Sequence, residues 1–357
     1  MPPNPHKLFE KSLTKNFKLN RAYARFGKVL IKLFQKFAGF GAEPQGFITF
    51  FETDLFLYMQ ERMINMKSST TRTTLIAISF ILPNFIGFAV FTLFPVLTSF
   101  VLAFMDWNAF ASPEFIGFDN FRRMASDESL HIAIRNTAWY TVAAVPLTLV
   151  AALGLAMLLN KAVFAMGFFR TAIFFPFITS MVAVAFVWSM ILHPIFGPVN
   201  MFLRSIGVDS PPMWLASTTW ALPSIVLASV WRFLGYYMVI YLAGLQAIPG
   251  TLYEAAEIDG ANSIKRFWYV TLPMLKPTTF FVTIMLTINT LRVFDLVQVM
   301  TGGGPGRATT VLVHQLYNAG FVRFEFGYAS AIALLLFGIT ITITIVQFVL
   351  GRKYSVD

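Results

Sequence analysis

Four polar side chains recur at every third position of an otherwise apolar stretch: Asn289, Arg292, Asp295 and Gln298. Their amides and charges could exchange hydrogen bonds with the hydroxyl groups of a small polar solute. On an uninterrupted helix Arg292 and Asp295 are close enough to pair, which lowers the cost of burying either charge. The pattern therefore predicts either the lining of a solute pathway or a polar contact between helices or subunits.

A weaker candidate of the same kind is Arg232, which is followed by Tyr236 and Tyr237. Aromatic rings can stack on the faces of sugar rings, but in a chain with 11 Tyr such clusters mostly reflect packing or an interfacial belt. His193 stands alone at the end of an apolar segment and is expected to be structural.

The sequence gives little support for a catalytic function. The chain contains no Cys, which excludes disulfides and thiolate metal sites. No metal-binding cluster, nucleophile triad or paired-carboxylate site emerges from the sequence. The glycine-rich residues 302–307 lack the G-x-x-x-x-G-K-[ST] spacing of a phosphate-binding loop and predict a tight turn. We expect a chain that is not an enzyme and holds no metal or cofactor.

Residues 248–277 carry the strongest local signals. Thr251 and Glu254 have capping-box spacing, in which the hydroxyl accepts from the third helical amide and the carboxylate reaches back to the cap amide. Gly260 can adopt the left-handed conformation that ends a helix. These signals predict a short helix over residues 252–259.

A second short helix is expected around residues 263–269, before Pro273 and Pro277 open the next long helix. The small side chains of Ala255 and Ala256 would let another protein approach the first helix closely. On local physics alone, however, the segment is a surface helix-turn-helix connector.

The elements that carry these residues are apolar helices. Hydrophobic residues make up 57% of the 357 and charged residues 12%, against about 25% charged in a soluble domain. Uncharged runs of roughly 20 residues match the thickness of a bilayer. We predict an all-α membrane protein with six transmembrane helices, at about 75–104, 138–159, 172–192, 222–247, 280–300 and 329–350.

The net charge of +10 is read as a topology signal and not as nucleic-acid binding. Residues 1–74 form a basic tail, and both termini are expected in the cytoplasm. Apolar residues from Phe26 to Phe37 fall at helical spacing, which predicts an amphipathic helix on the anionic inner leaflet. Alternatively, translation starts at Met63 or Met66, and residues 1–65 are not part of the native protein.

The 248–277 loop also carries a spaced signature: Glu254-Ala255-Ala256, then Gly260, then Val270-x-Leu272-Pro273 after nine residues. It resembles the EAA signature of permease subunits from binding-protein-dependent ABC importers, with Val270 where the family usually has Ile. The carbohydrate branch of that family, which includes glycerol-phosphate and oligosaccharide permeases, is similar at residues 115–121, 136–137, 231–249, 294–305 and 327–332. The resemblance covers about residues 76–352.

This resemblance implies the permease fold over residues 75–352 and a cytoplasmic coupling helix between the fourth and fifth transmembrane helices. The coupling helix would dock on a separate ATPase subunit, where ATP and Mg²⁺ are bound. The implied coupling residues are Thr251, Glu254, Ala255, Ala256, Asp259, Gly260, Leu272 and Pro273.

The resemblance also implies an assembly in a bacterial-type cytoplasmic membrane. Its members would be a second, non-identical permease, two ATP-binding subunits and an extracytoplasmic solute-binding protein. The expected substrate is a sugar or a related polyol. The alternative function is an ion-gradient-driven secondary transporter, which would predict internal repeats with broken helices at matched positions; the sequence contains no convincing repeat. A membrane receptor would carry a soluble signalling domain, which is not recognisable.

Overall fold

The computed structural model describes residues 70–160 and 165–351 and divides into two units, Met1–Phe88 and Ala89–Asp357. The predicted tail helix and the alternative start sites at Met63 and Met66 lie outside the described residues. In the first unit the described part is helix α5 (Thr70–Phe88), which contains Pro83. The apolar helical stretch Ile78–Leu102, which starts in α5, is long enough to cross a membrane.

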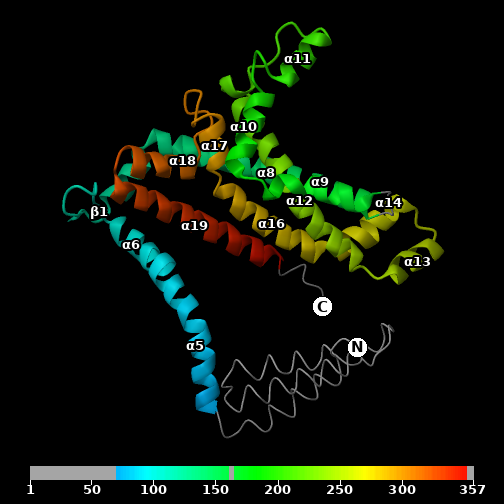
Figure 1. Cartoon of the computed structure of the whole chain (residues 1–357), viewed down its shortest axis with the longest axis horizontal. Coiled ribbons are helices and arrows are strands. Elements are labelled where there is room, and N and C mark those ends of the chain that lie inside the picture. Colours follow the sequence, from blue (N-terminus) through cyan, green and yellow to red (C-terminus); the bar gives the residue numbers. More distant parts are fainter. Residues whose placement is uncertain (1–69, 161–164, 352–357) are drawn as a thin grey trace, which may run out of the picture. The chain divides into compact units, whose positions relative to one another are not determined.

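The second unit is almost entirely helical (Figure 1). Two short strands, β1 (Met105–Asp106) and β2 (Glu114–Phe115), pair antiparallel. The helices, in chain order, are η2 (Ala89–Leu93), α6 (Phe94–Leu102), α7 (Asp119–Ser126), α8 (Glu128–Leu159), α9 (Met166–Ile178), α10 (Met181–Ile191), α11 (Pro198–Ser205), η3 (Trp214–Ala216), α12 (Ala221–Gln246), α13 (Gly250–Ile258), α14 (Ser263–Arg266), η4 (Phe267–Thr271), α15 (Leu272–Met274), α16 (Lys276–Leu291), α17 (Asp295–Met300), α18 (Leu312–Tyr317), η5 (Asn318–Val322) and α19 (Phe326–Gly351).

Within the described residues, four helical stretches are long and apolar enough to span a membrane, and two bent helix pairs raise the number to six if each pair is one span. The continuous ones agree with prediction within a few residues at most ends, although α8 begins ten residues earlier than the predicted start at 138. The predicted third and fifth spans are not straight helices. The third is α9 and α10, bent by 101°; the fifth follows a 65° bend between Met274 and Lys276 and breaks again after Leu291, before α17.

Helices α8 and α12 form the centre of the unit and pack on each other along their length. Gly235 on α12 permits the close approach of α9, because an added Cβ would collide with the backbone of Ile173 and Phe174. Two large apolar cores lie along the α8–α12 pair, and a third forms where α19 meets α7 and α18.

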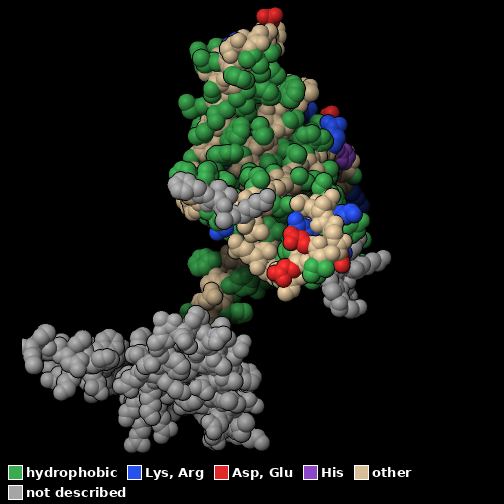
Figure 2. Space-filling model, turned by 90° about the vertical axis from the view of Figure 1, so that its right-hand side faces the viewer, with side chains coloured by type: hydrophobic (Ala, Val, Ile, Leu, Met, Phe, Trp, Pro, Cys, Tyr) green, Lys and Arg blue, Asp and Glu red, His purple; other side chains and the backbone are tan. Residues whose placement is uncertain are grey.

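Figure 2 shows a largely hydrophobic surface, with several acidic and basic side chains close together low on the end of the unit that faces the viewer and others along its right-hand edge and at its top. Helices α13 and α14 lie at that end of the unit, opposite β1 and α18 (Figure 1). Large exposed apolar side chains elsewhere, such as Val150 at 73% and Phe175 at 60%, are expected where lipid replaces water as the solvent.

Candidate functional site

Helix α13 begins earlier than predicted, and the capping box at Thr251 is wrong. The N-cap is Pro249, no side chain caps the helix, and Thr251 already lies in the first turn. Pro249 has φ −58° and ψ 131°, so its ring fixes an extended residue directly before the helix. The amide of Leu252 bonds to the Pro249 carbonyl at 3.2 Å, which closes the first turn two residues before the predicted start.

The end of α13 confirms the predicted glycine stop. Gly260 has φ +74°, and its amide donates to the Glu257 carbonyl at 3.0 Å. The next amide, of Ala261, donates to the Ala256 carbonyl at 2.8 Å. This pair of bonds is the Schellman arrangement, in which a left-handed residue satisfies the last carbonyls of a helix.

The second helix of the loop is shorter than predicted. Helix α14 covers only Ser263–Arg266 and continues as the π-helical turn η4 and the short α15, which contains Leu272 and Pro273. Its N-cap is Asn262, whose Oδ1 accepts from the Lys265 amide at 2.9 Å. Asn262 was missed as a cap, although Asn is a favoured N-cap residue and directly precedes the predicted start.

Two side-chain contacts fix α13 against the segment that follows it. Glu257 forms an ion pair with Arg266. The hydroxyls of Tyr253 and Thr271 lie 3.0 Å apart and share a hydrogen bond, and Thr271 is buried. Because these contacts join both halves of the loop, α13 is held as part of a rigid unit.

The outer surface of the loop is open. The side chains of Glu254, Ala255 and Asp259 are exposed, and Ala256 is half-buried. Large apolar side chains stand in solvent here: Ile258 (87% exposed), Ile264 (69%), Trp268 (58%) and Tyr269 (80%). Such a concentration of exposed apolar area next to small residues is typical of a surface that another protein covers.

The polar stripe of the predicted fifth span is divided between two helices. Asn289 lies near the end of α16, Arg292 is its C-cap, and Asp295 and Gln298 belong to α17. No ion pair joins Arg292 to Asp295 within the described segments, so the predicted pairing is wrong. The prediction assumed an uninterrupted helix, and the break between the two residues removes that geometry.

All four stripe residues are exposed on the surface of the chain. Asn289 donates to the Tyr237 hydroxyl at 3.1 Å, and Tyr237 belongs to the second predicted cluster, on α12. Tyr236 stacks on Phe177 with ring centroids 4.3 Å apart. The structure therefore brings the two clusters together.

Arg232 is engaged by protein groups. Its guanidinium donates to the backbone carbonyls of Pro176 and Phe177, the latter at 2.6 Å, and its Nε lies 3.0 Å from the sulfur of Met181.

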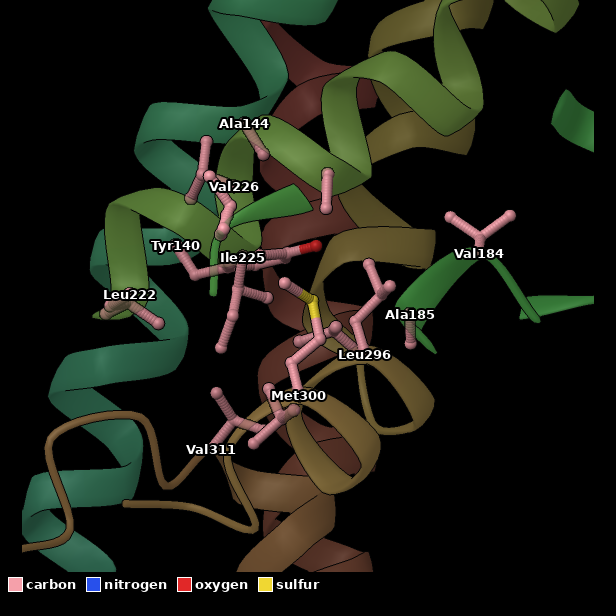
Figure 3. Packing of buried hydrophobic residues seen from close by; sticks show 14 residues of the cluster. Tyr140, Ala144, Val184, Ala185, Leu222, Ile225, Val226, Leu296, Met300 and Val311 are labelled. Atoms are coloured by element: carbon pink, nitrogen blue, oxygen red, sulfur yellow. The ribbon is translucent and has the colours of Figure 1, made fainter. Parts of the chain in front are cut away.

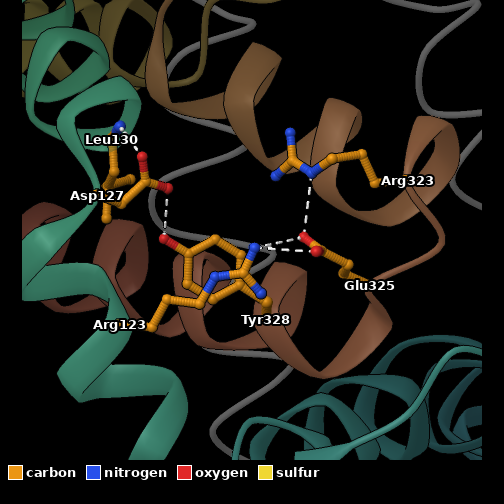
Figure 4. A network of polar contacts seen from close by, with 6 residues as sticks. All are labelled: Arg123, Asp127, Leu130, Arg323, Glu325 and Tyr328. Atoms are coloured by element: carbon orange, nitrogen blue, oxygen red, sulfur yellow. Dashed lines mark hydrogen bonds and ion pairs between the residues drawn. The ribbon is translucent and has the colours of Figure 1, made fainter.

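At the opposite end of the unit lies a polar network that the sequence did not reveal (Figure 4). Glu325 accepts two bonds from Arg123, at 2.9 and 3.0 Å, and one from Arg323 at 3.0 Å. The Tyr328 hydroxyl donates to Asp127 at 2.7 Å, and the Arg123 guanidinium lies over the Tyr328 ring. Arg123 and Glu325, and likewise Asp127 and Tyr328, are about two hundred residues apart in the chain, so the local pattern gives no signal for these two contacts.

Both carboxylates of this network have lowered pKa values. Burial would raise the pKa of Glu325, but the hydrogen bonds and charges of Arg123 and Arg323 outweigh it. Burial likewise opposes the lowering at Asp127, where the Tyr328 hydroxyl, the amides of Leu130 and Ser129 and the charge of Arg323 prevail.

The glycine-rich residues 302–307 form a turn, as predicted. Gly302, Gly303 and Gly306 have positive φ. The turn is held by Asn136, whose amide donates to the carbonyls of Arg307 at 3.1 Å and Thr310 at 2.9 Å. His193 accepts hydrogen bonds from two backbone amides through Nδ1, which agrees with its predicted structural role.

Residues 150–356 match the family of binding-protein-dependent transport system inner membrane components. The chain belongs to this permease family. A Bacillus subtilis relative, the probable ABC transporter permease protein YesP, is 38% identical over 79% of this chain and 93% of its own length. The trehalose/maltose transport system permease protein MalF of Thermococcus litoralis is 36% identical over 76% of this chain and 92% of its own.

A solved structure supports the fold. The crystal structure of a bacterial ABC transporter that imports the polysaccharide alginate contains a chain with a TM-score of 0.70, 24% identity and coverage of 83% of this chain and 100% of its own. As a permease, the chain is a multi-pass inner-membrane subunit of an ABC importer that works with a binding protein. It provides the membrane path, and ATP hydrolysis belongs to a partner chain.

Proposed function

We propose that this permease carries a sugar or a related polyol across the cytoplasmic membrane. The relative MalF is named for trehalose and maltose, and its match covers 76% of this chain and 92% of its own length. The exposed polar residues Asn289, Arg292, Asp295 and Gln298, together with Tyr236, offer donors, acceptors and a stacking ring on an otherwise apolar surface. Polar side chains within transmembrane segments usually face a solute path or a protein partner, because lipid does not solvate them.

The observation that carries the mechanism is the rigid, exposed helix α13 between the spans α12 and α16. Its start at Pro249, its stop at Gly260 and its bracing through Glu257 and Tyr253 let it transmit force without bending. We propose that α13 docks on the ATP-binding subunit at the cytoplasmic face. Glu254, Ala255, Ala256 and Asp259 would lie at that contact, next to the exposed apolar side chains.

The same proposal fixes the assembly and the topology. A second, non-identical permease would cover part of the membrane surface, two ATP-binding subunits would sit below, and the binding protein would dock on the outer side. Both termini would be cytoplasmic, so α13 lies inside and the residues of β1, β2 and α7 lie outside.

Thiol accessibility tests this topology directly, because the chain has no Cys. Ile258→Cys, 87% exposed on the loop, is expected to react with a membrane-impermeant maleimide in inside-out vesicles stripped of the ATP-binding subunits, and not in right-side-out vesicles. The matched control is Phe110→Cys, 82% exposed between β1 and β2, which is expected to react in right-side-out vesicles only. Labelling of Ile258→Cys from the outside would contradict the proposal.

Purification of the assembled complex with its binding protein then identifies the solute by mass spectrometry. Uptake of that solute into proteoliposomes should require internal ATP and persist when proton and sodium gradients are collapsed. Uptake that follows an ion gradient without ATP would favour the secondary-transporter alternative.

A further inference from the structure

Two of the predicted spans are broken, and an arginine bonds across the first break. Helices α9 and α10 meet at 101° across residues 179–180, and α16 stops at Leu291 before α17 begins at Asp295. Arg232 bonds to the end of α9 and to Met181 at the start of α10.

The segments on either side of the breaks belong to different apolar cores. Val184 and Ala185 of α10 pack with Leu296 and Val297 of α17 in one cluster (Figure 3). The segments before the breaks belong to the other cluster, which contains Val282 and Leu286 of α16 and, at its edge, Ile173 of α9. Only α8 and α12 contribute to both clusters, so they run uninterrupted past the level of the breaks.

The last backbone carbonyls of α9 need hydrogen-bond donors from outside the helix. The last carbonyls of a helix have no intrahelical amide to accept from, and in a membrane an unsatisfied carbonyl is costly. The Arg232 guanidinium supplies donors to the carbonyls of Pro176 and Phe177, and it also lies over the Phe177 ring, 5.6 Å from its centroid. Conversely, an arginine within a span needs partners, and the break provides them.

We propose that Arg232 is a positioning residue that fixes the bend between α9 and α10 and so sets the position of α10 and of α17, which packs on it. The outer pair, α10 and α17, then tilts as one body on the uninterrupted helices α8 and α12. This inference concerns the mechanics of the permease and stands independently of which solute it carries.

Distances between spin labels test the proposal in the assembled complex in nanodiscs. One pair, Phe175→Cys with Met190→Cys, spans the α9–α10 break at two exposed positions. A reference pair, Leu158→Cys with Phe281→Cys, uses exposed positions of α8 and α16, two helices that pack on each other. If Arg232 causes the bend between α9 and α10, its removal should leave that bend without a defined angle.

In the Arg232→Met background, the α9–α10 distance distribution is expected to broaden at least about twofold, while the reference pair keeps its width. The matched control is Arg123→Met, which removes an arginine that is paired with Glu325 far from the breaks and should leave the α9–α10 width unchanged. Arg232→Lys should recover part of the narrow distribution, because an ammonium can donate to the same carbonyls but lacks the planar fork.

An unchanged α9–α10 width in Arg232→Met would overturn the proposal. Equal broadening of both pairs would also overturn it, because it would mean general loosening and not loss of a specific bend. Should Arg232→Met fail to assemble, the α9–α10 pair is measured in Arg232→Lys against the wild type, and an unchanged width there overturns the proposal.

Discussion

Substitutions of Gly260 separate the backbone conformation at the end of α13 from its contacts. Gly260 has φ +74°, and an added Cβ would meet no atom within 4 Å. Within this chain, a new side chain at position 260 therefore meets no steric collision. The free-energy cost of the substitution comes from the preference of the new residue for other backbone conformations. Asn visits the left-handed region readily, Ala costs roughly 1–2 kcal/mol there, and a β-branched Val costs more.

The expected effect follows from that strain. About 1.4 kcal/mol changes an equilibrium tenfold, so Gly260→Ala should lower the ratio of capped to frayed α13 by about one order of magnitude. Gly260→Val should lower it further, and Gly260→Asn should stay close to the wild type. Fraying breaks the hydrogen bonds that the backbone amides of Gly260 and Ala261 donate, and the helix loses the stiffness on which coupling depends.

The assay is solute uptake per ATP hydrolysed by the complex in proteoliposomes. We expect the order Gly, Asn, Ala, Val, with Gly260→Val inserted in normal amount but largely uncoupled. Equal coupling by Gly260→Val and Gly260→Asn would refute the backbone reasoning. Equal failure of both would also refute it, because the glycine would then serve close approach of the ATPase and not helix termination.

Three further predictions concern stability. The pKa values of Asp127 and Glu325 are lowered in the folded state, so both carboxylates stabilise the fold above their ordinary pKa values of 3.8 and 4.5. This stabilisation is lost as the pH falls through the lowered pKa values. Hydrogen exchange of the amides at the start of α8 and of α19 should therefore rise on acidification over that range. Asn136→Leu leaves two carbonyls of the glycine-rich turn without donors and should destabilise the complex by about 1–3 kcal/mol in thermal unfolding. Tyr253→Phe removes the hydrogen bond to Thr271 and should cost about 0.5–1.5 kcal/mol, seen as faster exchange of α13 amides; unchanged exchange would mean that this bond does not brace the loop.

Hydropathy located the straight spans well, because insertion depends on the summed apolarity of one segment. The predicted spans 222–247 and 329–350 correspond to α12 at Ala221–Gln246 and α19 at Phe326–Gly351. The stop at Gly260 was also predictable, since glycine adopts a left-handed conformation at no steric cost. Both properties are local, and local sequence is sufficient for them.

The start of α13 was misassigned because two N-terminal signals competed. Thr251 and Glu254 satisfy the capping-box pattern, but Pro249 lies two residues earlier and begins the helix without a side-chain cap. The bonds between Arg123 and Glu325 and between Asp127 and Tyr328 depend on chain segments that meet only in the folded protein. No single-sequence pattern carries that information.

The breaks in the third and fifth spans are accompanied by a signal in the sequence, an arginine within an apolar segment, which a hydropathy sum does not use. A summed scale treats Arg232 and Arg292 as penalties within otherwise favourable helices, yet each marks a place where helical carbonyls lack amide partners. Arg292 is itself the C-cap of α16, and Arg232, on an unbroken helix, serves the end of α9 across the interface. Each of these two charges therefore lies at the end of a helix, its own or a neighbouring one, where free carbonyls can serve as partners for a charge in a membrane.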